Sequence, residues 1–174
     1  MARYEIIHAC GHAENTQIYG PMRERQGKAD WLASRDCAEC YQRKLQQQRA
    51  EASTRAAAQS AAAGLPALSG SDKQIAWAET LRCDNLRGIP NMLRLRERVQ
   101  THDIPGARAE TMTALRTATL DAIDALMRRA SAHEWIETRS SEPFDLVSKS
   151  PEVARLMNVV RAEIKGSKQQ EVIA

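Results

Sequence analysis

The pattern of hydrophobic and polar residues at the start of the chain differs from that of the remainder. Short runs rich in β-forming residues occupy positions 3–7 and 16–19, and the turn formers Gly11 and Gly20 interrupt and end them. Short runs bounded by glycine in this way are typical of a β-hairpin. Residues 22–35 carry many charges and predict one or two turns of helix.

The stretch that follows is built differently. Residues 41–64 consist of strong helix formers with almost no large apolar side chain. A helix of this composition has little surface to bury against a neighbour. We therefore expect an exposed helical spacer over residues 46–64, ending at Gly64 with Pro66 just beyond it.

From residue 65 onward, apolar residues recur with the 3.6-residue period of amphipathic helices. Ser71 and Gln74 form a capping-box pattern, which predicts the start of a helix. One half of this helix gathers Ile75, Trp77, Ala78, Leu81 and Leu86. Gly88 and Pro90 end it, and a shorter helix follows whose inward residues are Met92, Leu95 and Val99.

The longest predicted helix covers about residues 107–137. Its apolar stripe consists of Met112, Leu115, Thr119, Ala122, Ile123, Leu126, Met127 and Ala130. His133 falls on the same stripe, which favours a core histidine over a catalytic base. Residues 140–150 predict a loop, and Ser150 followed by Pro151 starts a last helix. That helix buries Val153, Leu156, Met157, Val160 and Ile164.

The composition fits helices that pack through aliphatic side chains, because 43% of the residues are hydrophobic but only 4% are aromatic. The net charge of +3 is well below that of a chain that coats nucleic acid non-specifically. The first residues lack the pattern of a secretory signal, and no stretch approaches the roughly 18 apolar residues of a membrane helix. We expect a cytoplasmic protein without membrane contact, in which clustered cysteines stay reduced and indicate metal ligands.

Two pairs of metal-ligand residues stand out near the start of the chain. Cys10 and His12 flank Gly11, which allows a tight turn, and Cys37 and Cys40 have the C-x-x-C spacing where a helix should begin. A helix start is electropositive and suits thiolates. A knuckle, a hairpin and two cysteines on a helix start are the layout of a treble-clef or zinc-ribbon module. The pattern predicts a zinc site on Cys10, His12, Cys37 and Cys40.

The ligand set leaves alternatives open. His8 could replace His12, and Cys83 could supply a thiolate from the later helices, although a buried inert thiol is the favoured interpretation of Cys83. Ordinary thiols with a surface histidine are the other reading. A redox dithiol at Cys37 and Cys40 lacks the βαβ context that such chemistry needs. Because all four predicted ligands are protein groups, a structural ion is expected rather than a catalytic one.

These elements predict a mostly α fold in three parts. Residues 1–45 form a small zinc-stabilised β-hairpin and helix module, residues 46–64 form the polar helical spacer, and residues 65–174 form a helical bundle. About 45 residues with little apolar mass need a metal to fold, and zinc supplies on the order of 10 kcal/mol at neutral pH.

Arginines gather between positions 82 and 98, and they suggest a phosphate-facing surface in which Arg87, Arg94 and Arg98 take part. A solvated helix face is the competing interpretation. Trp77 and Trp135 are expected to anchor the bundle or to top a binding groove. The sequence contains no nucleophile elbow, phosphate loop or paired carboxylates, so we expect no enzymatic activity and no small-molecule substrate.

Several of these motifs together resemble a known group of proteins. The chain combines YEI and CGH, Trp31 and Leu32 ahead of C-x-x-C-Y, an Ala/Gln-rich helix, and the stretch SDKQIAWAE. In this it is similar to small zinc-ribbon or treble-clef-like proteins carried by bacterial phages, plasmids and integrative elements, mainly over residues 3–45 and 69–87. The resemblance implies a zinc-binding knuckle on Cys10, His12, Cys37 and Cys40, and it implies no particular activity.

Two functional hypotheses follow. The first is a non-enzymatic zinc-containing binding protein of a mobile genetic element that contacts nucleic acid or a nucleoprotein. The second is a protein–protein interaction module, such as an inhibitor of a host defence or regulatory complex. Nucleic-acid affinity should fall steeply with salt, because phosphate contacts release counterions, whereas an apolar docking surface should respond much less.

Overall fold

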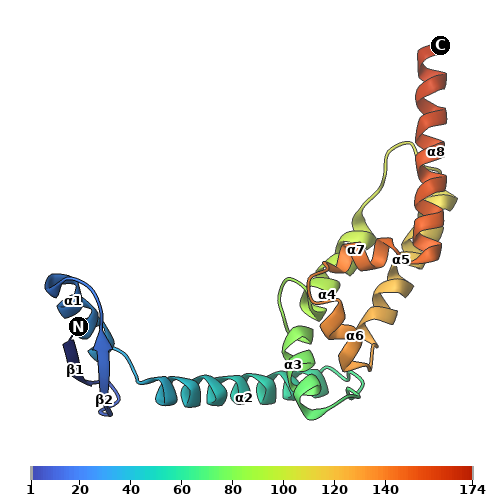
Figure 1. Cartoon of the computed structure of the whole chain (residues 1–174). Helices are drawn as coiled ribbons and strands as arrows, with labels where there is room; N and C mark the ends of the chain where they lie inside the picture. The colour runs from blue at the N-terminus through green and yellow to red at the C-terminus, as the bar shows by residue number, and fades with distance from the viewer. Residues whose placement is uncertain (1, 174) are drawn as a thin grey trace. The chain divides into compact units, whose positions relative to one another are not determined.

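The computed structural model describes residues 2–173 of the chain. It divides into two compact units, Met1–Glu51 and Ala52–Ala174 (Figure 1). The first begins with an antiparallel pair of strands, β1 (Ala2–Ile7) and β2 (Ala13–Ile18), and all the other elements of the described residues are helices. The predicted fold class, a hairpin followed by a mostly helical chain, is confirmed.

The first unit packs one helix on the hairpin. The strands pair from Ala2 opposite Ile18 to Ile7 opposite Ala13, and α1 (Met22–Ala33) contacts both strands. Alternating side chains of a strand point to opposite faces, so Ile6 is buried while its neighbour Ile7 is exposed. The fully buried apolar residues of this unit are Ile6, Ile18 and Ala29. With 12 residues, α1 is longer than the one or two turns that the sequence predicted.

The long polar helix is α2 (Ala38–Ala62), which begins in the first unit and ends in the second. Its last helical residue is Ala62, two residues before the predicted end at Gly64, which has a φ of +67°. The amide of Gly64 donates to Ala61 and that of Leu65 donates to Ser60, the hydrogen-bond pair of a Schellman motif. Most of the helix is exposed, but Ala56 and Ser60 are buried, so its last turns are not a free spacer.

Six helices make up the rest of the second unit: α3 (Asp72–Arg82), α4 (Ile89–Thr101), α5 (Ala109–Met127), α6 (Ala132–Glu137), α7 (Pro143–Ser148) and α8 (Pro151–Ile173). Helix α5 packs against α4, α7 and α8, and α3 packs against α6. The predicted capping box at the start of α3 is present, since Ser71 and Gln74 bond each other's backbone amides. The buried core includes Met92, Leu115, Ile123, Leu126, Trp135, Leu156 and Val160.

The single helix predicted over residues 107–137 is in fact two. Helix α5 ends at Met127, and Ser131 then caps α6 by accepting the amide of Glu134. The indole of Trp135 donates to the carbonyl of Arg129, which the turn leaves free of helical bonding. This break lets Trp135 enter the core, where it is 4% exposed, and its predicted anchoring role is confirmed.

The same break explains why His133 is not the core histidine that was predicted. Helix α6 restarts the register at Ala132, so Ala132 and Trp135 face inward and His133 faces solvent. Its imidazole lies 3.3 Å from the carboxylate of Glu137. Ala130, also assigned to the apolar stripe, is exposed in the turn before α6.

Two other predictions in this unit are wrong. Residues 140–150 are not simply a loop, because Pro143 starts the short helix α7, in which Val147 is buried. Helix α3 ends at Arg82, before Gly88, because the carboxylate of Asp84 accepts the amides of Leu86 and Arg87 and turns the chain. As a result Leu86 is exposed.

Trp77 is not an anchor of the bundle. The side chain is 48% exposed, and the guanidinium of Arg139 lies 5.8 Å from its ring centroid. The predicted anchoring role of Trp77 is wrong because half of the helical wheel was assigned to the core. The face of α3 that packs against α6 is narrower than that half.

Candidate metal centre

The first ligand pair lies in the turn between β1 and β2. Gly11 has a φ of +82°, a conformation that side-chain-bearing residues rarely adopt. Its amide donates to the carbonyl of His8, and the amide of His8 donates to the carbonyl of His12. This tight knuckle holds Cys10 and His12 one residue apart on a short, hydrogen-bonded loop.

The second pair lies at the start of α2, as predicted. Cys37 immediately precedes the helix, Cys40 belongs to its first turn, and the amide of Tyr41 donates to the carbonyl of Cys37. The amide of Cys37 is free of helical bonding and donates to the thiol sulfur of Cys10 at 3.2 Å. The electropositive helix start thus faces the sulfur atoms.

Hydrogen bonds outside the ligand set connect the two pairs. The amide of Ala9 donates to the carbonyl of Arg35, 2.9 Å away. Nδ1 of His8 donates to the carbonyls of Leu32 at 3.0 Å and Arg35 at 3.3 Å. The knuckle is therefore tied to the residues that lead into Cys37.

The four ligand groups meet in one place. One ligand atom each from Cys10, His12, Cys37 and Cys40 lies within 4.8 Å of all the others. Nδ1 of His12 is 3.3 Å from Sγ of Cys40 and 3.7 Å from Sγ of Cys37. A tetrahedral zinc ion with Zn–S near 2.3 Å and Zn–N near 2.0 Å separates such atoms by about 3.6 Å. The side chains thus fit a tetrahedral ion, and the four cysteines of the chain are free of disulfides.

The thiols of the cluster differ in their readiness to ionise. The amides of Cys37 and His12 lower the pKa of the Cys10 thiol to about 6. Burial and the neighbouring thiols of Cys37 and Cys10 raise the pKa of Cys40 to about 11. One thiolate is stabilised by backbone dipoles, and a second is disfavoured beside it. A divalent cation among the sulfurs removes this conflict, since it binds all of them as thiolates.

The two alternative ligands are placed elsewhere. Both ring nitrogens of His8 are used, Nδ1 by the two carbonyls and Nε2 by the carboxylate of Glu14 at 3.1 Å. Burial of His8 opposes its charge, but the bond to Glu14 and the two carbonyl bonds outweigh it and raise the pKa above its usual value. Cys83 lies in the second unit, where its thiol donates to the carbonyl of Ala56. His8 thus stabilises the loop around the site through hydrogen bonds, and Cys83 is not part of the site.

Three aromatic side chains of the first unit are exposed. Tyr19, Trp31 and Tyr41 are between 51% and 64% exposed. The guanidinium of Arg35 lies over the ring of Trp31, 4.2 Å from its centroid. These three residues were not among the predicted binding residues, because the sequence alone does not indicate which aromatic rings stay exposed after folding.

The arginines of residues 82–98 differ in their exposure and their partners. Arg82 is 1% exposed and bonds the buried carboxylate of Glu79, which also accepts the hydroxyl of Ser60. Arg96 pairs with Asp124. The three residues predicted to contact nucleic acid, Arg87, Arg94 and Arg98, are exposed, and the guanidinium of Arg94 donates to the carbonyl of Asn85.

No protein-family model, curated protein or solved structure matches the chain. The resemblance to proteins of mobile elements therefore stays a prediction. Within residues 2–173, no helix is both long and apolar enough to span a bilayer.

Proposed function

We propose that Cys10, His12, Cys37 and Cys40 bind one zinc ion that holds the first unit together. The observation that carries this proposal is the mutual approach of three sulfurs and one imidazole nitrogen at separations that suit a tetrahedron. Four protein ligands fill the coordination of zinc, so the ion is structural and not catalytic. A reducing compartment such as the cytoplasm keeps these thiols available.

Native mass spectrometry tests the zinc proposal directly. The purified chain should carry one zinc ion, and Cys37→Ser should lose it. Cys83→Ser is the matched control, because it removes the one cysteine outside the cluster and should keep the ion. A fully folded chain without metal, or zinc loss in Cys83→Ser alone, would contradict the assignment.

The role that we propose for this zinc protein is non-enzymatic binding of nucleic acid or a nucleoprotein. Support comes from the exposed rings of Tyr19, Trp31 and Tyr41, and from the cation that Arg35 adds at Trp31. Base stacking on exposed rings contributes about 1–3 kcal/mol per base, and an adjacent arginine adds a cation–π contribution. An origin in a bacterial mobile element is part of this proposal and rests on the sequence resemblance.

Fluorescence anisotropy with a labelled 30-nucleotide single strand and the matching duplex tests this role. Binding should weaken steeply between about 50 and 200 mM salt. Trp31→Ala should weaken it roughly five- to 150-fold if one base stacks there. Trp77→Ala is the control, since that indole is similarly exposed but lies in the second unit. Equal loss in both variants, or none in either, would contradict the placement on the first unit.

The segment 82–98 is tested on the same strands with charge reversal at Arg94 and Arg98. If these side chains contact phosphate, each reversal should lower affinity and reduce the salt dependence by about one released counterion. An unchanged affinity would remove the segment from the nucleic-acid proposal.

A specific observation favours protein–protein interaction as a second candidate function. The second unit contains a groove of about 710 Å³ between α4, α5, α7 and α8. Its lining is mainly aliphatic, and such grooves are typical of sites that accept an apolar helix face.

A further inference from the structure

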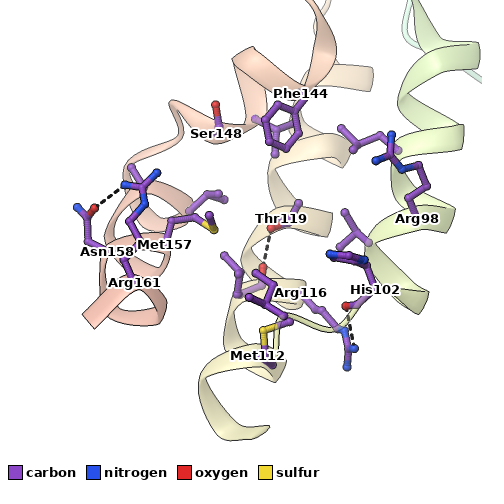
Figure 2. Close-up of a pocket in the computed structure, with 17 residues that line it drawn as sticks. Arg98, His102, Met112, Arg116, Thr119, Phe144, Ser148, Met157, Asn158 and Arg161 are labelled. Atoms are coloured by element: carbon purple, nitrogen blue, oxygen red, sulfur yellow. Dashed lines mark hydrogen bonds between the residues drawn. The ribbon is translucent and has the colours of Figure 1, made fainter. Parts of the chain in front are cut away.

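The groove of the second unit has an apolar floor and a basic rim (Figure 2). The floor comprises aliphatic and methionine side chains of the three helices α4, α5 and α8: Leu95, Val99, Met112, Leu115, Val153 and Met157. Its volume of 710 Å³ lies within the range of about 300–1,000 Å³ that is usual for ligand sites. Phe144 stands at one end and is 61% exposed.

The groove is longer than this volume alone indicates. A second hollow of 250 Å³ shares Leu95, Arg98 and Phe144 with the first and continues along α4 to Asn91 and Arg94. An elongated occupant therefore fits better than a compact one. This extension also contains Glu142, which is the one acidic residue of the two linings among the described residues.

The charges of the main groove are all of one sign. Arg98 of α4, Arg116 of α5 and Arg161 of α8 line it, and none of its described lining residues is acidic. Arg116 bonds Asp103 and the carbonyl of His102, and Arg161 donates to the neutral amide oxygen of Asn158. Figure 2 shows Arg98 and Arg161 on opposite sides of the floor.

The distribution of charge around the groove indicates which class of ligand fits it. An alkyl carboxylate carries its charge at one end and calls for cations that converge there, whereas these come from three different helices. A nucleic-acid strand would need several rings to stack on, and Phe144 is the one phenyl ring of the described lining. A helix with apolar residues at i, i+3, i+4 and i+7 and carboxylates along both flanks matches floor and rim together.

We propose that the groove between α4, α5, α7 and α8 binds an acidic amphipathic helix of a partner protein. The apolar face of that helix lies on the floor beside Phe144, and its flanking carboxylates pair with Arg98 and Arg161. This inference rests on the protein-interaction role proposed above, and it involves neither the zinc site nor the exposed rings of the first unit.

Three designed peptides probe the groove on the full zinc-loaded chain. The first is an 18-residue fluorescein-labelled helix with leucines on one face and glutamates on both flanks. The second replaces each glutamate by lysine, and the third keeps the composition of the first but spreads the leucines around the helix. The acidic amphipathic peptide should bind at least tenfold more tightly than the other two. Equal or weaker binding of that peptide would overturn the proposal.

Charge reversal then tests whether the arginines of the rim contact the peptide. The double variant Arg98→Glu, Arg161→Glu should lose at least tenfold in affinity for the acidic peptide and should prefer the lysine peptide, which general damage to the fold would not produce. Phe144→Ala should weaken binding of the acidic peptide and of the lysine peptide. The control is Arg87→Glu, Arg128→Glu, which reverses two exposed charges outside the groove and should retain the original preference. A preference that persists in the double variant would place the peptide elsewhere and overturn the proposal.

Two further measurements address other occupants. Sedimentation that shows a dimer disrupted by Phe144→Ala would identify a second copy of this chain as the occupant and overturn the proposal. Displacement of the peptide by dodecanoate at lower concentration than by unlabelled peptide would identify an acyl anion instead. Zinc content is measured on the same samples, so failure of peptide binding with zinc retained contradicts the groove and leaves the metal assignment intact.

Discussion

The two units of this chain are held together by different means. The first has three fully buried apolar residues, Ile6, Ile18 and Ala29, next to a cluster of three thiols and an imidazole. The second buries a continuous hydrophobic core that includes Trp135 and Ile123. A small unit with so little apolar burial needs another source of stability, whereas the larger one has enough in its core. Stability should therefore depend on metal in one unit and on packing in the other.

Metal removal should produce the largest difference in stability between the two units. A strong chelator should remove on the order of 10 kcal/mol of apparent folding free energy from the first unit, because ligand binding and folding are coupled there. Hydrogen exchange measured by mass spectrometry should then lose protection over residues 2–37 and retain it over residues 109–160. Equal loss in both segments, or none in either, would remove the contrast.

Truncation of Trp135 should give the reverse result. The side chain is 4% exposed and its indole bonds the carbonyl of Arg129, so Trp135→Ala should cost about 3–5 kcal/mol. Chemical denaturation monitored by circular dichroism measures this loss, and zinc content should stay at one ion. Trp77→Ala, at a half-exposed indole, should cost much less. Similar losses for the two tryptophans would contradict the assignment of the core.

Two glycine substitutions test how closely the backbone of the second unit is packed. A Cβ at Gly88 would lie 2.4 Å from the carbonyl oxygen of Arg82 and 2.6 Å from that of Leu81. Gly88→Ala must shift the backbone between α3 and α4, and overpacking of this kind costs about 1–3 kcal/mol. At Gly166 of α8 nothing lies within 4 Å of the added atom. Gly166→Ala should therefore raise stability by about 0.5–1 kcal/mol in the same unfolding assay.

The smallest expected effect is the pH dependence that Glu163 gives to the stability of the second unit. The amide of Arg108, the hydroxyl of Thr111 and the guanidinium of Arg108 donate to Glu163 and hold its pKa below the usual value of 4.5. A lowered pKa in the folded state favours the carboxylate, so its stabilising effect is present above pH 4.5 and is lost as pH falls through the folded pKa.

Glu163→Gln should therefore flatten the fall of the melting temperature below about pH 4.5. Glu152→Gln is the comparison, because the ion pair of Glu152 with Arg155 is exposed on both sides and should contribute less. A steeper dependence in Glu163→Gln would contradict the sign.

The two units also differ in how much of them the sequence could predict. The four metal ligands were predictable because close spacing, a glycine turn and a helix start are all local signals. The break after α5 was missed although Ser131 and Glu134 form a cap pattern, since the apolar period continues through it. The exposure of Trp77 and the groove depend on which helices become neighbours, and no local pattern contains that information. Position 88 needs glycine because the turn after α3 brings the carbonyl oxygens of Leu81 and Arg82 close to it, and the sequence alone does not give the path of that turn.

We propose that one metal ion bound by Cys10, His12, Cys37 and Cys40 organises the first unit. X-ray absorption at the zinc edge of the purified chain measures the ligand atoms directly. We expect three sulfurs at about 2.3 Å and one nitrogen at about 2.0 Å from the zinc. A shell of oxygen and nitrogen alone, or fewer than three sulfurs, would contradict it.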